Sequence, residues 1–183
     1  MIGGALFRRA DQAERRLCLF ANAACRRESV RIFFRLVSRL GDGVFWYLLM
    51  ATMPLWMLWS GRGGLADGLE VAAEMLAAGA TGLLLYKALK NRLVRERPFI
   101  GLIGIECAMP PLDRYSFPSG HTLHAVTFTS LAIHHIPELA GVLVPFALLV
   151  AASRVVLGLH YPSDVLAGAL LGAGIAAGTV TLV

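Results

Sequence analysis

Long apolar segments alternate with short polar ones over most of the chain beyond residue 40. Five of them come close to the roughly 20 residues that a helix needs to cross about 30 Å of hydrocarbon. They cover residues 44–60, 69–89, 122–136, 139–157 and 165–183. The third is short and contains His124, and the fourth contains Pro145, so the ends of these two are the least defined. The pattern predicts about five transmembrane helices.

Residues 1–40 follow a different pattern. Leu6, Ala10, Ala13 and Leu17 recur at helical spacing while arginines fill the other faces, and a second repeat of this kind starts near residue 30. Basic amphipathic helices usually lie in the headgroup layer, and the alternative is a helix packed over the bundle. A Gly-Asp-Gly turn at 41–43 ends this segment. The chain therefore divides into interfacial helices at 1–40 and a transmembrane bundle at 41–183.

Composition supports the bilayer as the solvent. Of 183 residues, 57% are hydrophobic and only 16% are charged, which is unusual for a water-soluble domain of this size. The formal net charge is +5, but the basic residues lie beside apolar segments and no nucleic-acid motif accompanies them. We therefore expect an all-α integral membrane helix bundle whose partners are membrane lipids rather than nucleic acid.

Three charged stretches, at residues 90–98, 118–121 and 153–164, lie at the ends of apolar segments. Charged groups at such depth are costly unless they are paired, hydrated or bound to a ligand. Five crossings would bring all three stretches to one side of the membrane, together with residues 1–40. The sequence therefore predicts a single polar site assembled from distant parts of the chain.

Among the cations of the charged stretches, Lys90, Arg97 and Arg154 are the candidates for binding a phosphate. One arginine side chain can donate two parallel hydrogen bonds to two oxygens of a phosphate, whereas lysine carries a more compact positive charge. Any one of these side chains alone would more simply be explained as reaching toward the lipid headgroups. Their combination in one site favours a cradle for a phosphate.

Ser119, Gly120 and His121 directly precede the third apolar segment. Serine is a good helix cap, so a helix is expected to begin here and to direct free backbone N–H groups at an anion. Gly120 would allow the backbone to approach a phosphate oxygen closely, and His121 could donate a proton. These three residues are candidate parts of the phosphate site.

His160 and Asp164 form a candidate catalytic pair. A carboxylate that accepts a hydrogen bond from one imidazole nitrogen orients the ring and leaves the other nitrogen free for nucleophilic attack. A structural hydrogen bond is the equally weighted alternative for such a pair in isolation. The nearby Arg154 favours the nucleophile.

Together, Lys-x6-Arg-Pro, Pro-Ser-Gly-His and Ser-Arg-x5-His-x3-Asp resemble the motifs of the type 2 phosphatidic acid phosphatase superfamily. That superfamily also includes glucose-6-phosphatase and vanadium haloperoxidases. All three motifs match in order and in internal spacing, between Lys90 and Asp164.

The resemblance implies a role for each residue. His160 would attack phosphorus to form a phosphohistidine, Asp164 would orient it, and His121 would protonate the leaving oxygen. The phosphate would be held by Lys90, Arg97, Arg154, Ser119 and Gly120. No metal or other cofactor is expected, because the cations replace it and no cluster of carboxylates for magnesium is visible.

The expected function is hydrolysis of a phospholipid or polyprenyl phosphate or diphosphate. A phosphotransferase would use the same residues and pass the phosphoryl group to another acceptor. A membrane scaffold that binds lipid headgroups without turnover is the non-enzymatic alternative. A vanadate-dependent oxidase is disfavoured by the several membrane spans.

Arginine placement predicts the orientation. The resemblance implies a protein of the bacterial inner membrane, and many bacterial members of the superfamily have this site outside the cytoplasm. In this chain, however, the arginines from Arg8 to Arg39 lie on the side of the site, against Arg62 on the other. The positive-inside rule therefore predicts a site that faces the cytoplasm, on the same side as the N-terminus.

Overall fold

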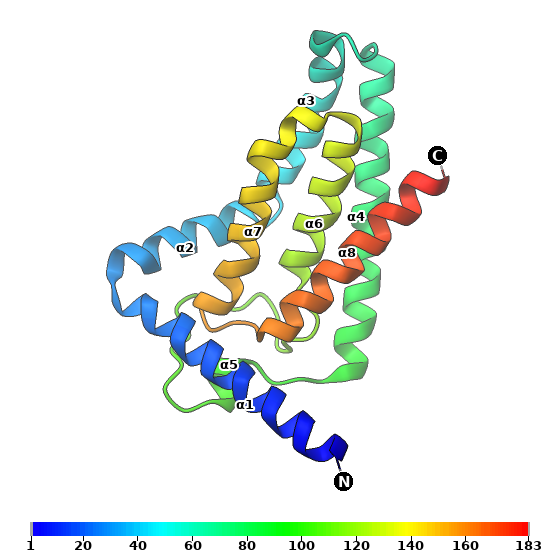
Figure 1. The fold of residues 1–183 in the computed structure, drawn as a ribbon. Helices are drawn as coiled ribbons and strands as arrows, with labels where there is room; N and C mark the ends of the chain where they lie inside the picture. The colour runs from blue at the N-terminus through cyan, green and yellow to red at the C-terminus, as the bar shows by residue number, and fades with distance from the viewer. Residues whose placement is uncertain (1, 183) are drawn as a thin grey trace.

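The computed structural model describes residues 2–182, which fold into helices joined by turns and loops, without any strand. Figure 1 shows the arrangement. The elements in chain order are α1 (Ile2–Ala23), η1 (Ala24–Arg26), α2 (Glu28–Leu40), α3 (Val44–Ser60), α4 (Leu65–Leu93), α5 (Pro98–Gly101), α6 (Gly120–His135), η2 (Pro137–Leu139), α7 (Ala140–Val156) and α8 (Pro162–Leu182).

Five long helices run up and down between two ends of the bundle. From α3 onward they alternate in direction, and α1 lies across the end at which α4 and α7 finish and α6 and α8 begin (Figure 1). The N-terminus is near this end and the C-terminal helix points to the other (Figure 1). We call the first one the site end, since all three charged stretches meet there. The convergence expected from span counting is thus present.

The number of crossings stays a prediction. Within residues 2–182, three segments are long and apolar enough to cross a membrane, namely Leu65–Gly101, Pro137–Val156 and Pro162–Leu182. Helices α2 and α3, bent by 49° at the turn between them, would make a fourth if they form one broken span. Helix α6 has only 16 residues, which is short for a full crossing.

Both interpretations of the N-terminal segment find support. Phe20, Ile32 and Leu36 expose large apolar side chains, as a helix in the headgroup layer requires. Other side chains of α1 and α2 face the protein: Arg35 donates a hydrogen bond to the Ala108 carbonyl. The segment therefore packs on the site end of the bundle, and its placement in the headgroup layer stays a prediction.

Glycines bring α6 and α8 close together. A methyl group on Gly168 would lie 2.5 Å from the Ser119 carbonyl oxygen, and one on Gly172 would lie 2.4 Å from that of Leu123. Only glycine fits at either position, which is the close backbone approach that small residues permit in membrane bundles. Gly174 has open space around it. The contact fixes the start of α8, and with it Asp164, beside the start of α6.

Candidate active site

A cavity of about 420 Å³ opens at the site end. Side chains from all three charged stretches line it, and the apolar faces of α3 and α4 form its other wall. Its charged and histidine side chains are Asp42, Lys90, Arg97, Asp113, His121, His124, Arg154 and His160. Residues separated by more than a hundred positions thus share one small space.

Lys90 and Arg97 hold one carboxylate between them. The Lys90 ammonium donates to both oxygens of Asp113, at 2.7 and 2.6 Å, and to the Tyr115 carbonyl at 3.0 Å. The Arg97 guanidinium donates to the Asp113 carboxylate at 2.6 Å and to its backbone carbonyl at 3.1 Å. Both cations are buried, at 6% and 1% exposure. The first motif therefore builds a site for an oxyanion.

Asp113 belongs to the long loop between α5 and α6. Burial alone would raise the pKa of its carboxyl, but the hydrogen bonds and charge of Lys90 and Arg97 outweigh burial and hold the pKa below its ordinary value. The group is therefore a carboxylate at neutral pH. The two carboxylate oxygens of Asp113 show where Lys90 and Arg97 would donate hydrogen bonds to two oxygens of a bound anion.

Arg154 is the third buried cation, at 2% exposure near the end of α7. One of its terminal nitrogens donates to the Ser38 hydroxyl, while its Nε has no hydrogen-bond partner within the described part of the chain. A buried donor without a partner is costly, so it is suited to a ligand that supplies an acceptor. Arg154 thus retains an N–H group for a ligand, whereas each guanidinium nitrogen of Arg97 already has a hydrogen-bond partner.

The Ser-Gly-His motif begins α6, as its sequence predicts. Ser119 is the N-cap, and its hydroxyl accepts a hydrogen bond from the Thr122 backbone N–H at 3.4 Å. His121 lies on the first turn of α6 and lines the cavity. Its Nε2 contacts the carboxylate of Asp42. The ring nitrogens of His124, one turn further on, lie 3.0 Å from the Gly120 carbonyl and 3.2 Å from that of Gly79, so this side chain makes polar contacts within the bundle.

His160 lies in the turn between α7 and α8, almost fully buried at 2% exposure. Burial, together with the positive charges of Arg154, Arg97 and Lys90, holds the pKa of its imidazole well below the ordinary value. The ring is therefore neutral at pH 7. Its Nε2 lies 3.3 Å from the Arg97 guanidinium, which donates, so Nε2 is the unprotonated nitrogen. A lone pair thus points into the cradle.

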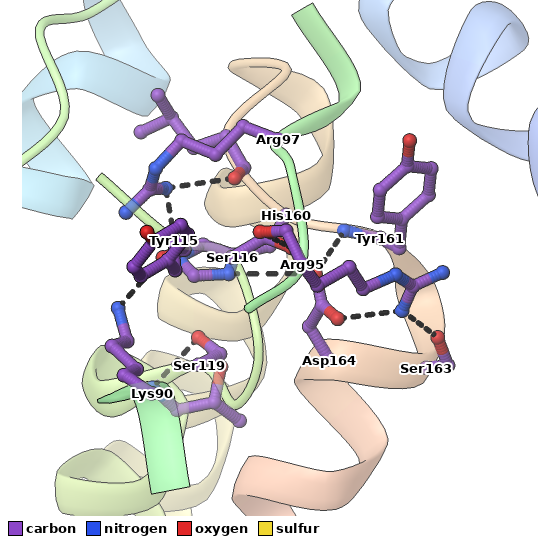
Figure 2. Close-up of polar contacts among 12 residues, drawn as sticks. Lys90, Arg95, Arg97, Tyr115, Ser116, Ser119, His160, Tyr161, Ser163 and Asp164 are labelled. Carbon is purple, nitrogen blue, oxygen red and sulfur yellow. Dashed lines mark hydrogen bonds and ion pairs between the residues drawn. The ribbon is translucent and has the colours of Figure 1, made fainter. Parts of the chain in front are cut away.

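Asp164 is close to His160 but does not accept a hydrogen bond from it. The distance from its Oδ2 to His160 Nδ1 is 3.7 Å, which is too long for one. Its oxygens accept instead from Arg95 at 2.6 Å and from the Tyr161 backbone N–H at 2.8 Å (Figure 2). Asp164 is thus placed behind the ring, with its closest contacts to other donors.

Arg95 ties the site to the N-terminal helix. Its guanidinium donates to Asp164 and, at 2.7 Å, to Ser163 (Figure 2). It also donates to Glu14 of α1 at 2.8 Å and lies 4.0 Å from the centre of the Tyr161 ring. Glu14 also accepts from the Ser163 backbone N–H at 2.8 Å. Helix α1 is therefore joined to the start of α8 by ion pairs.

Sequence reasoning missed three residues of the site, Asp42, Arg95 and Asp113. Arg95 occupies an unassigned position inside the first motif, and Asp113 precedes the second motif within a loop of no clear periodicity. Asp42 was assigned only to a helix-breaking turn. Each is a charged residue at the membrane depth of the motifs, and this was the signal that could have identified them.

The described residues contain no group of three or more His, Cys, Asp or Glu side chains placed to hold a metal ion. The charged groups that line the cavity are instead three cations and two carboxylates, each carboxylate bonded to a basic side chain. This donor set matches an anion better than a cation.

The chain belongs to the PAP2 superfamily, whose sequence model matches residues 71–183. That range contains all three motifs, and the match confirms the resemblance inferred from them. The chain is 38% identical over 119 residues to the decaprenylphosphoryl-5-phosphoribose phosphatase of Mycolicibacterium smegmatis, a match that covers 62% of each. It is 36% identical over 112 residues to the phosphatidylglycerophosphatase B of Bacillus subtilis, covering 54% of this chain and 51% of that protein. The chain thus matches less than two thirds of these relatives' length.

Two crystal structures share the fold over nearly the whole chain. Aquifex aeolicus LpxE superposes with a TM-score of 0.74 at 25% identity, covering 91% of this chain and 93% of that one. The PAP2-type phosphatidylglycerolphosphate phosphatase of Bacillus subtilis gives 0.71 at 26% identity, covering 94% and 85%. With these transmembrane relatives and the apolar helices, the protein is an all-α integral membrane bundle, as the sequence predicts.

Proposed function

We propose that this protein hydrolyses a lipid phosphate or diphosphate at the cavity of the site end. The observation that carries the proposal is the convergence of Lys90, Arg97 and Arg154 with two histidines around one space of about 420 Å³. Cations at this density stabilise the charge that develops on phosphoryl oxygens. The relatives named as lipid and polyprenyl phosphatases support the same chemistry.

In the first step, the Nε2 lone pair of His160 attacks phosphorus in line with the bond to the lipid oxygen. As that bond breaks, His121 gives a proton to the leaving oxygen, and a phosphohistidine remains. The phosphoryl oxygens accept hydrogen bonds from Lys90, Arg97 and Arg154, so the substrate takes the place of Asp113 on the first two. Arg97 leaves Nε2 for the phosphate at the same time.

In the second step, water attacks the phosphohistidine. His121, now neutral, takes a proton from the water, and phosphate departs with the His160 lone pair restored. Asp164 sits behind His160 and stabilises positive charge on the ring while the P–N bond exists. Gly120 lines the cavity at the start of α6, whereas Ser119, which was expected to bind the phosphate, is fully buried outside the cavity lining and caps the helix. No step needs a metal ion, so hydrolysis is expected to proceed in EDTA.

An apolar path from the cavity suits a lipid tail. The wall formed by α3 and α4 includes Tyr47, Met50 and Leu76, and the same three residues line a second cavity of about 270 Å³ further along these helices. The two cavities therefore adjoin, and the second is lined mainly by apolar residues. We propose that the phosphate enters the site while the tail lies along α3 and α4, so the substrate arrives sideways from the bilayer.

Leu76→Trp tests this path. The larger side chain would fill the junction of the two cavities, so we expect KM for a long-chain lipid phosphate to rise about tenfold while a short-chain phosphate is hydrolysed as before. Leu84→Trp is the matched control, since Leu84 lies on the same helix at 71% exposure and lines neither cavity. If the two variants show equal kinetics, the lipid tail does not lie in this groove.

Phosphate release from purified protein tests the reaction itself. We expect release from phosphatidic acid, phosphatidylglycerol phosphate, prenyl phosphates or prenyl diphosphates, in detergent or nanodiscs, without any added acceptor. A phosphotransferase would release little phosphate until a lipid or sugar acceptor is supplied. A lipid-binding scaffold would bind these lipids and release none, and this outcome would refute the enzyme proposal.

We further propose that the site faces the cytoplasm of a bacterial inner membrane, as the arginines of the N-terminal segment indicate. Cys107 is a native reporter, because it is exposed in the loop at the site end while Cys18 and Cys25 are buried. A membrane-impermeant maleimide should label Cys107 in inside-out vesicles and not in spheroplasts. Cys107→Ser should abolish the label, and labelling in spheroplasts would reverse the orientation.

A further inference from the structure

The carboxylate of Asp42 lines the cavity but belongs to none of the three motifs. A negative charge in a site for an anionic substrate opposes binding unless it serves another group. Asp42 has such a partner, because one of its oxygens contacts Nε2 of His121. The contact joins the turn between α2 and α3 to the first turn of α6.

The turn between α2 and α3 fixes the position of Asp42. The Asp42 backbone N–H donates to the Arg39 carbonyl at 3.1 Å, and that of Gly41 donates to the Val37 carbonyl at 3.0 Å. Gly43 follows with a φ of 119°, a conformation that favours glycine. A methyl group on Gly41 would lie 3.0 Å from both methyls of Val150, so the turn also packs closely on α7. The carboxylate is therefore fixed relative to Arg154, one turn further along α7.

We propose that Asp42 is a positioning residue for His121. The inference rests on the proposed function, in which His121 protonates the leaving oxygen. A carboxylate bonded to one ring nitrogen fixes the plane of an imidazole and stabilises its protonated form, which is the form that can act as an acid. Nε2–H of His121 donates to Asp42, and Nδ1 makes no hydrogen bond with any side chain or backbone group that the structure describes. Nδ1 is thus the nitrogen that faces the leaving oxygen.

The proton balance follows from this geometry. With the anionic phosphate bound beside it, His121 carries a proton on each nitrogen, and the Nδ1 proton passes to the lipid oxygen as the P–O bond breaks. The neutral ring keeps its Nε2 proton and its bond to Asp42, so it is oriented to take a proton from water in the second step. Asp42 touches neither the phosphorus nor the leaving group.

The leaving group provides a test that a purely structural role would not satisfy. Alkyl phosphates need a proton on the leaving oxygen, whereas aryl phosphates leave with little help. We expect Asp42→Asn to lower kcat about a hundredfold for dodecyl phosphate and less than about fivefold for 4-octylphenyl phosphate, with KM little changed. The ratio of the two rates, measured in one preparation, does not depend on the amount of folded protein.

A double-mutant cycle with His121→Asn provides an independent readout. If Asp42 acts through His121, Asp42→Asn costs nothing further once the imidazole is gone. Asp67→Asn is the matched control, since Asp67 caps α4 through the Gly64 backbone and lies in neither cavity. It should leave both rates unchanged.

Equal losses on the alkyl and aryl phosphates, or losses that add in the double mutant, would overturn the assignment of Asp42. An increase of KM without a change in kcat would do the same, because it would place Asp42 in substrate binding. A wild-type protein that releases no phosphate from any lipid phosphate or from these probes would instead contradict the proposed function.

Discussion

Replacing His160 with alanine is expected to abolish phosphate release, by at least about a thousandfold, while the protein still folds. The imidazole supplies the lone pair that attacks phosphorus, since Nε2 of His160 lies 3.3 Å from the Arg97 guanidinium. Phosphate release from a lipid phosphate, measured in nanodiscs against wild type, checks this expectation.

His134→Ala is the matched control for His160→Ala. His134 is exposed at the end of α6 that lies away from the site, so its removal should change nothing. Retention of the α-helical circular dichroism signal by His160→Ala would show that the loss concerns chemistry. Full phosphate release by His160→Ala would rule out the phosphohistidine mechanism.

Arg154→Gln is expected to have the second largest effect, a loss of about a thousandfold in kcat/KM. The three equatorial oxygens gain charge in the transition state, and Arg154 is the cation that brings an unused donor to them. Arg154→Lys keeps the charge but loses the paired geometry of the guanidinium, so it should restore part of the activity. Steady-state kinetics on one lipid phosphate compares the three proteins.

Arg114→Gln is the control for charge as such, because Arg114 is exposed on the loop beside the site and its guanidinium lies over the Tyr115 ring. It should remain within about twofold of wild type. If Arg114→Gln and Arg154→Gln lose activity alike, general electrostatic attraction of lipid would explain both, and Arg154 would not be part of the cradle.

Much of the fold follows from apolar periodicity. The apolar segment 44–60 coincides with α3, and the start of α6 follows from the capping preference of Ser119. Helix α4, in contrast, continues to Leu93, four residues past the end of the apolar segment, because charged residues on its last turn find partners at the site end. Hydropathy alone cannot include these residues.

The site was predictable where motifs carried it. Lys90, Arg97, Arg154, His121 and His160 were expected to share one space, and all five line the same cavity. Their individual roles stay proposals. Asp113 was not predictable as a partner, because its contacts with Lys90 and Arg97 join a structureless loop to two helix ends and leave no periodic trace in the sequence.

The pairing of Asp164 shows a further limit of spacing arguments. It follows His160 by four positions in the sequence, but Pro162 starts α8 between them and turns the carboxylate toward Arg95 and the Tyr161 backbone. Whether a ring and a carboxylate meet depends on backbone geometry within one turn, and on competing donors such as Arg95. The spacing of two residues in the sequence gives neither the backbone geometry of the turn nor the competing donors.

Rapid-quench labelling tests most directly whether His160 carries the phosphoryl group during the reaction. Protein mixed with a ³²P-labelled lipid phosphate and quenched in alkali within milliseconds should carry a label that is stable to alkali and lost in acid. A phosphohistidine intermediate predicts that this label maps to the peptide containing His160 and is absent from His160→Ala. Rapid phosphate release with no label on His160 at any time would contradict it.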